Sequence, residues 1–123
     1  MEILGLDHIN IRTPDLESAR RFYCQVLGLE DGFRPPFPAP GAWLYAGGRP
    51  VVHLVETDRP EDTPTGRFNH VAFAATGFHE TLAALDANAI AYRVAEVPGS
   101  PVRQIFVTDP DGITVELNFA SET

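Results

Sequence analysis

The chain has 123 residues, of which 44% are hydrophobic, and nine basic against seventeen acidic side chains give it a net charge of −8. This length predicts one domain, residues 1–123, with a sizeable core, and the negative charge argues against nucleic acid and anionic membrane surfaces as partners. No stretch approaches the ~20 apolar residues of a membrane span, the first residues do not resemble a signal peptide, and the single Cys24 cannot form an intrachain disulfide. We therefore expect a cytoplasmic protein.

The first half of the chain predicts a strand, a helix and three further strands. A strand around His8 is followed by a turn at residues 13–15 and by a helix that ends at Gly28. The apolar stripe of this helix is expected to comprise Leu16, Ala19, Phe22, Tyr23, Val26 and Leu27. A strand in LEDGFR and a two-strand hairpin in AWLYAGGRPVVHLVE, turning at Gly47 and Gly48, complete residues 4–56.

The second half repeats this pattern. FNHVAFAAT predicts a strand with a histidine in third place, Gly77 ends it, and a helix containing Phe78, Leu82 and Leu85 follows. IAYRVAE predicts a strand, and RQIFVTDPDGITVELNF predicts a hairpin that turns at residues 109–112. Residues 57–66, TDRPEDTPTG, have the composition of a connector. We therefore predict two βαβββ modules within the one domain, residues 4–56 and 67–119.

Four polar side chains occupy related positions in the two modules. His8 and His70 lie 62 residues apart, and His53 and Glu116 lie 63 apart. Each alternates with apolar neighbours, so each points away from the face that packs on the helices. A lone histidine or glutamate on a strand is more often structural, but three imidazoles and one carboxylate match the ligand chemistry of a first-row metal. The spacing alone leaves both roles open.

Further cavity residues follow from the same alternation. We expect substrate contacts from Asn10, Arg12, Trp43, Tyr45, Arg103 and Asn118. Arg12 could instead form a salt bridge at the end of its strand, and Trp43 and Tyr45 could instead pack in the core. The segment FRPPFPAPGAW holds four prolines and is expected to be a stiff loop. It could cover the pocket through Phe33 and Phe37, form a dimer contact, or be a plain exposed loop.

Two motifs resemble a known family. FYCQVLGLE resembles the helix-to-strand signature of the vicinal oxygen chelate (glyoxalase, bleomycin resistance and extradiol dioxygenase) superfamily, and DPDGITVEL resembles its C-terminal hairpin with the metal-binding glutamate. The resemblance covers about residues 4–119. It implies an α+β fold in which two βαβββ modules, related by a pseudo-two-fold axis, form an open, cup-shaped mixed sheet around one divalent metal. It also implies that His8, His70 and Glu116 are ligands and that the chain forms a homodimer.

The residue at position 53 departs from the family pattern. Glyoxalase- and epimerase-like members commonly have Glu or Gln there, and dioxygenase-like members do not use the position as a ligand. If His53 binds, as its place opposite Glu116 in the repeat favours, the set of three histidines and one glutamate favours Zn, Ni, Co or Fe over Mg. If it does not, His8, His70 and Glu116 form a set suited to Fe(II) and O₂, with His53 as an adjacent acid or base.

The resemblance implies a metal-dependent lyase or isomerase, glyoxalase- or epimerase-like, acting on a small metabolite with two neighbouring oxygens. Such a metal stabilises an oxyanion, and Glu116 is the candidate base, although a permanently bound ligand is the alternative role. One alternative function is an Fe(II) extradiol-type ring-cleavage dioxygenase. Another is a non-enzymatic antibiotic-sequestering protein, which would have no use for four metal-binding side chains. No motif indicates the substrate or any use of glutathione.

Overall fold

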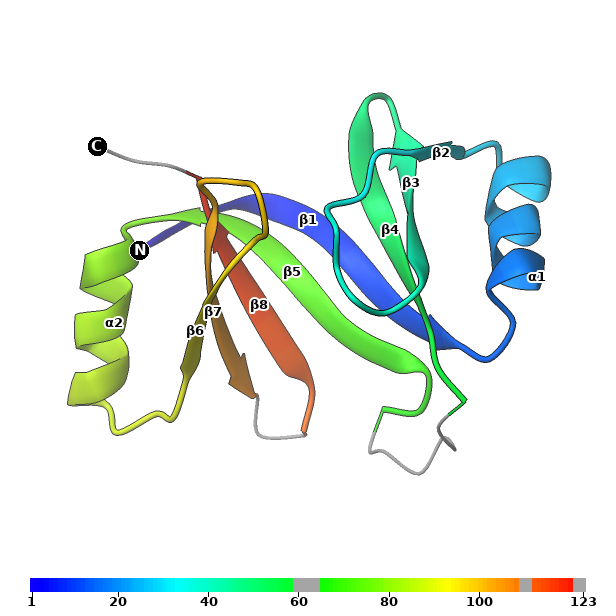
Figure 1. Ribbon diagram of the computed structural model, residues 1–123. Coiled ribbons are helices and arrows are strands. Elements are labelled where there is room, and N and C mark those ends of the chain that lie inside the picture. Colours follow the sequence, from blue (N-terminus) through cyan, green and yellow to red (C-terminus); the bar gives the residue numbers. More distant parts are fainter. Residues whose placement is uncertain (59–64, 109–111, 121–123) are drawn as a thin grey trace.

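The computed structural model describes residues 1–58, 65–108 and 112–120. Its elements in chain order are β1 (Glu2–Thr13), α1 (Leu16–Arg21), the π-helical turn η1 (Phe22–Val26), β2 (Glu30–Gly32), β3 (Gly41–Ala46), β4 (Arg49–Glu56), β5 (Phe68–Thr76), α2 (Phe78–Ala87), β6 (Arg93–Glu96), β7 (Arg103–Thr108) and β8 (Thr114–Phe119). Within these residues the strands form one mixed sheet in the order β2-β3-β4-β1-β5-β8-β7-β6 (Figure 1). The predicted α+β class is confirmed.

The sheet also shows the predicted repeat. The first strands of the two modules, β1 and β5, are antiparallel neighbours at its centre, and each pairs on its other side, in parallel, with the last strand of its own module. Asn10 lies opposite His53 in one module, and Ala72 lies opposite Glu116 in the other. These pairs are related by the same offsets of 62 and 63 residues, so the pseudo-two-fold arrangement is confirmed. The module boundaries stay a prediction, and most of the connector and of the 109–112 turn lies outside the described residues.

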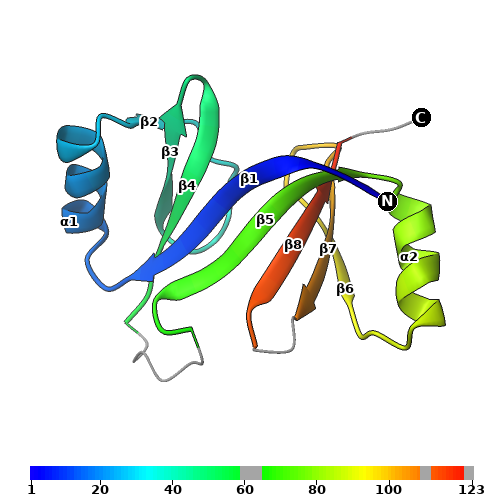
Figure 2. The same cartoon turned by 180° about the vertical axis from the view of Figure 1, so that it is seen from behind.

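The two helices pack at opposite ends of the molecule, outside the sheet (Figures 1 and 2). One core cluster forms against α1 and contains Leu16, Ala42, Leu44, Val52 and Leu54. The other forms against α2 and contains Ala75, Phe78, Ile105, Leu117 and Phe119. Because the helices occupy one face of the sheet, polar side chains collect on the opposite face. Within the described part of the chain, neither helix is long and apolar enough to cross a membrane.

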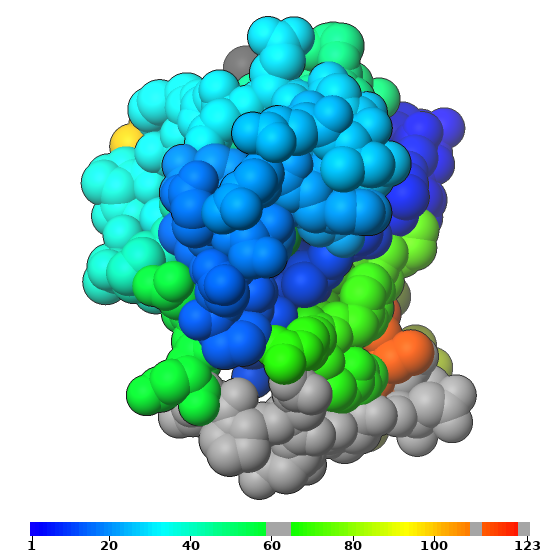
Figure 3. Space-filling view, turned by 90° about the vertical axis from the view of Figure 1, so that its right-hand side faces the viewer, coloured from blue at the N-terminus to red at the C-terminus, as the bar shows by residue number. Residues whose placement is uncertain are grey.

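The first helix differs from its prediction in its second half. It begins as an α-helix, with the Asp15 side chain accepting from the Ser18 amide at 3.0 Å, and continues as the π-turn η1. The Leu27 amide donates to the Phe22 carbonyl, five residues back, at 3.3 Å. This wider turn shifts the helical phase, so the predicted stripe is wrong for Phe22, Val26 and Leu27, which are exposed. Figure 3 shows the α1 side chains covering this end of the molecule.

The hairpin that carries His53 follows its prediction. Strands β3 and β4 pair antiparallel and are joined by Gly47 and Gly48 alone. Both glycines have positive φ, 58° and 80°, as a two-residue turn of this kind requires. The turn pairs Ala46 with Arg49, and a register shift between Leu44 and Tyr45 then places Trp43 directly opposite His53.

Candidate metal centre

A cavity of about 600 Å³ opens on the polar face of the sheet. Both modules contribute to its lining, which includes His8, Asn10, His53, His70 and Glu116. Most of the other lining residues are apolar, and a few convergent polar groups in a largely apolar pocket are typical of a small-molecule site.

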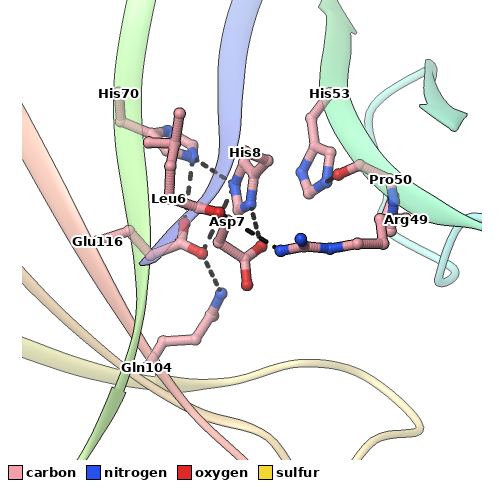
Figure 4. A network of polar contacts seen from close by, with 9 residues as sticks. All are labelled: Leu6, Asp7, His8, Arg49, Pro50, His53, His70, Gln104 and Glu116. Atoms are coloured by element: carbon pink, nitrogen blue, oxygen red, sulfur yellow. Dashed lines mark hydrogen bonds and ion pairs between the residues drawn. The ribbon is translucent and has the colours of Figure 1, made fainter. Parts of the chain in front are cut away.

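His8, His70 and Glu116 come together on three adjacent strands, β1, β5 and β8 (Figure 4). His8 and Glu116 flank Ala72, whose small side chain leaves room between them. The two Nε2 atoms are 3.1 Å apart, and Glu116 Oε1 is 3.1 Å from His70 Nε2. One ligand atom from each of the three residues lies within 4.8 Å of the others.

The chemistry of this cluster fits a divalent metal. Glu116 is only 3% exposed, and its carboxylate contacts two imidazoles and the Gln104 amide, whose Nε2 donates to Oε2 at 3.1 Å. A buried carboxylate needs a positive charge or several donors to offset its loss of hydration. Two imidazole nitrogens and a carboxylate oxygen are also the donor types that Zn, Ni, Co and Fe accept.

Asp7 sets the tautomer of His8. His8 Nδ1 lies 2.8 Å from Asp7 Oδ1, and an ionised carboxylate can only accept, so Nδ1 carries the proton and leaves Nε2 as the lone-pair donor. Sequence analysis missed Asp7, because strict alternation places it on the other face. A register shift between Leu6 and His8 breaks the alternation and brings Asp7 beside the cavity. The adjacent Asp-His pair is the signal that could have found it.

His53 lies beside this cluster rather than within it. Its ring stacks between His8 and Trp43, with centroid distances of 3.6 and 3.9 Å, and its Nε2 lies 3.1 Å from the Pro50 carbonyl, to which it donates. Burial, followed by electrostatic interaction with the neighbouring His8, lowers the pKa of His53 to about 2, so the His53 ring is neutral. Among the described residues, His53 is not part of the group that could hold a metal ion, and its ligation stays a prediction.

The family model described as "Glyoxalase/Bleomycin resistance protein/Dioxygenase superfamily" matches residues 5–117. The chain belongs to this superfamily. It is 28% identical to "Glyoxylase I 4" of Arabidopsis thaliana, over 95% of this chain and 71% of that protein. It is 29% identical to the mitochondrial methylmalonyl-CoA epimerase of Bos taurus, over 94% of this chain and 74% of that protein.

Solved structures of the superfamily share the fold. A variant of Streptomyces coelicolor methylmalonyl-CoA epimerase superposes with a TM-score of 0.72 and 22% identity, covering 97% of this chain and 96% of that one. The catechol dioxygenase BphC superposes with a TM-score of 0.72 and 17% identity, covering 99% of this chain but 41% of that one. The same architecture therefore occurs in proteins named for different reactions.

Three of the six predicted substrate-contacting residues of this superfamily member line the cavity: Asn10, Trp43 and Asn118. Asn118 Oδ1 is buried and has no hydrogen-bond partner among the described residues, so it is free to accept a donor from a ligand. This placement agrees with the expected role of Asn118, which stays a prediction.

The structure places Arg12, Tyr45 and Arg103 outside the cavity lining. In the orientation that satisfies its neighbours, the Asn69 amide accepts from Arg12 Nη2 at 2.6 Å and donates to His70 Nδ1 at 2.7 Å. That donation leaves the proton of a neutral His70 on Nε2, so metal binding at Nε2 requires the amide to turn its oxygen toward Nδ1, where Oδ1 lies 2.7 Å away. Arg103 lies over the Phe78 ring, 4.0 Å from its centroid. Tyr45 comes directly after the register shift that follows Leu44, and its hydroxyl donates to the Phe33 carbonyl at 2.5 Å.

The proline-rich segment lies at the cavity. Its lining residues are Phe33, Arg34, Pro35, Phe37, Pro38 and Ala39. Of the three roles left open by the sequence, this placement favours a loop that covers the pocket. Sequence analysis named Phe33 and Phe37 there but missed Arg34, because a charged residue between apolar ones in a loop follows no periodicity.

Proposed function

We propose that this protein is a divalent-metal-dependent lyase or isomerase, glyoxalase- or epimerase-like, that acts on a small metabolite with two neighbouring oxygens. The observation that carries the proposal is the convergence of His8, His70 and Glu116 at the wall of a ligand-sized cavity. The relatives that match nearly all of this chain include proteins named for glyoxalase and epimerase activity, which supports proton-transfer chemistry. The expected metal is Zn, Ni, Co or Fe.

The three cluster residues would hold the ion, and a bound ion would supply Lewis acidity that stabilises negative charge on a substrate oxygen. Asp7 keeps Nε2 of His8 available as a donor. Glu116 is the proposed base: its carboxylate would release the ion transiently, accept the proton from the substrate carbon beside the two oxygens and return it to the same or the neighbouring carbon. This transfer is redox-neutral and needs no further reactant.

The proposal is tested with protein loaded separately with Zn, Ni, Co and Fe(II). Each form is incubated in D₂O with the glutathione hemithioacetal of methylglyoxal or with methylmalonyl-CoA, and NMR measures deuterium incorporation at carbon. We expect incorporation with at least one metal and none with the His70→Ala variant. Absence of exchange with every metal would count against lyase or isomerase activity on these two substrate types.

An Fe(II) ring-cleavage dioxygenase is the second candidate. The specific observation in its favour is that two histidines and one carboxylate converge while His53 stands beside them, which is the arrangement expected for Fe(II) and O₂. Oxygen uptake with catechol, seen only in the Fe(II) form and without deuterium exchange, would move this candidate ahead.

Removing the carboxylate beside His8 should weaken metal binding. In Asp7→Asn the amide can donate to Nδ1 and so favour the wrong tautomer; we expect affinity to fall by about 10–100-fold, the usual cost of losing such a partner. Competition with a chromogenic chelator measures the affinity. Asp31→Asn is the matched control, because Asp31 pairs with Arg20 at 2.6 Å and does not line the cavity. Equal affinity in the two variants would contradict the role given to Asp7.

Three further proposals concern the type of ligand, the cellular location and the oligomeric state. We retain a small-molecule substrate without nucleic-acid partners, supported by the cavity and the net charge of −8. We retain a cytoplasmic location, supported by the single cysteine. The homodimer rests on the family resemblance, and sedimentation of the purified protein tests it.

A further inference from the structure

Arg34 brings an unpaired positive charge to the cavity. It lies in the proline-rich segment and belongs to the cavity lining. Its Nε atom is buried and has no hydrogen-bond partner among the described residues. Burial lowers the pKa of the Arg34 guanidinium, which shows that desolvation there is not offset by a nearby carboxylate. A buried donor without a partner carries a free-energy cost, and such groups in a cavity wall call for an explanation.

The backbone on both sides of Arg34 is held in place. The Tyr45 hydroxyl donates to the Phe33 carbonyl at 2.5 Å, Pro35 is buried, and the Phe37 amide donates to the Pro35 carbonyl at 2.7 Å. These contacts and the fixed φ of the prolines hold the backbone at Arg34, and the buried Nε and the Phe37 ring restrict its side chain. A positioned cation loses less entropy on binding a ligand than a mobile surface arginine does.

Gly41 makes the space that the guanidinium occupies. A Cβ at this position would come too close to the Leu54 backbone carbonyl oxygen, and it would also lie 2.7 Å from Arg34 Nη2 and 2.9 Å from Cζ. The absence of a side chain at Gly41 therefore lets the charged group lie against strand β3 rather than project outward.

An aromatic wall links Arg34 to the metal-binding cluster. Arg34 Cζ lies 5.2 Å from the Phe37 ring centroid, and the Phe37 and Trp43 centroids are 6.1 Å apart. Trp43 stacks on His53 at 3.9 Å, and His53 stacks on His8 at 3.6 Å. A ligand lying along this wall would meet a cation at one end, the aromatic rings in its middle and the cluster at the other end.

The charges around the cavity favour an anion at Arg34. The other charged side chains of its described lining are Asp7, which accepts from His8, and Glu116, which belongs to the cluster. Arg34 is thus the one cationic lining residue there, and none of its contacts is with a carboxylate. The planar fork of a guanidinium matches the two oxygens of a carboxylate, and a single charge in an apolar surround suits a singly charged partner.

We propose that Arg34 binds the carboxylate of an aromatic carboxylate ligand, whose ring lies on Phe37 and Trp43 and whose neighbouring oxygens face the His8, His70 and Glu116 cluster. The placement of the neighbouring oxygens at the cluster rests on the proposed function, whereas the carboxylate subsite itself does not. The subsite deepens that function by restricting the substrate to a molecule with an anionic group remote from the reacting oxygens.

Trp43 is the single tryptophan of the chain and reports on this subsite. Its fluorescence is titrated with benzoate and with benzamide, a neutral molecule of nearly the same shape, on chelator-treated protein. We expect benzoate to bind at least about tenfold more tightly, the factor that corresponds to about 1.4 kcal/mol. Arg34→Gln should abolish this preference. Arg103→Gln is the matched control, since Arg103 also lies over a phenylalanine ring but outside the cavity, and it should keep the preference.

The proposal is overturned if the wild-type protein binds the two probes equally, if benzoate does not perturb Trp43 at all, or if Arg34→Gln keeps the preference for benzoate. Inorganic phosphate, competing with benzoate, separates the two kinds of anion: tighter binding of phosphate would overturn the assignment to a carboxylate. Because the titrations use metal-free protein, their failure leaves the metal-dependent function untouched. Loss of metal binding likewise leaves the carboxylate subsite testable.

Discussion

His70→Ala is expected to lose a metal ion that the wild-type protein binds in about one equivalent. The substitution removes one of three converging donors and leaves two, and the buried Glu116 carboxylate then keeps only His8 and Gln104 as polar contacts in the cluster. Metal content of the purified proteins, measured by elemental analysis after reconstitution and desalting, gives the result directly. The remaining histidine, His79, is exposed on α2, so His79→Ala is the matched control and should retain the metal.

His53→Ala in the same experiment decides between the two ligand sets. With the three-residue set we expect the metal to stay, because Nε2 of His53 donates to the Pro50 carbonyl and its ring stacks between His8 and Trp43. Loss of metal from His53→Ala to the same extent as from His70→Ala would place His53 among the ligands and favour the glyoxalase-like set. A wild-type protein that binds no metal after reconstitution would refute the metal centre and favour a binding protein.

Chelation should destabilise the folded protein as well as stop the reaction. A ligand that binds only the folded state stabilises it by about 4 kcal/mol when its concentration is a thousandfold above Kd. For a domain of this size, that free energy corresponds to a fall of roughly 15 °C in the midpoint of thermal unfolding once the metal is removed. Differential scanning calorimetry with and without EDTA measures the change, and re-addition of metal should reverse it.

His70→Ala serves as the control for chelation, because a variant without metal should show the same midpoint with and without EDTA. Whichever reaction the deuterium-exchange assay detects should fall by at least about 100-fold on chelation, as expected when Lewis-acid stabilisation of an oxyanion is lost. Activity that survives complete removal of the metal would refute the metal-dependent mechanism, even if the midpoint moves.

Periodicity and repetition were enough to predict most of the sheet and three members of the candidate site. Side chains alternate across a strand with period two, so His8, His70 and Glu116 could be assigned to one face without coordinates. The offsets of 62 and 63 residues then predicted that related positions in the two modules share that face. Neither signal requires the distances between these side chains in space to be known.

Local departures from ideal geometry could not be predicted in this way. The register shift before His8 brings Asp7 to the cavity, and the π-turn after α1 exposes Phe22 and Val26. Both insert one residue into a regular repeat, and such an insertion depends on the partner strand or helix rather than on the segment itself. Alternation alone therefore assigns the wrong face at these points.

By itself the sequence determined the two βαβββ modules, the shared face of the four polar residues and the chemical type of the candidate ligands. Only the tertiary structure decided that three of them converge, that His53 stacks on His8, and that Arg34 lies at the same cavity. The physical reason is the separation along the chain of the residues that each kind of interaction joins. Alternation and capping act between residues close in the chain, whereas ring stacking, ligand distances and the path of a proline-rich loop depend on how distant segments pack.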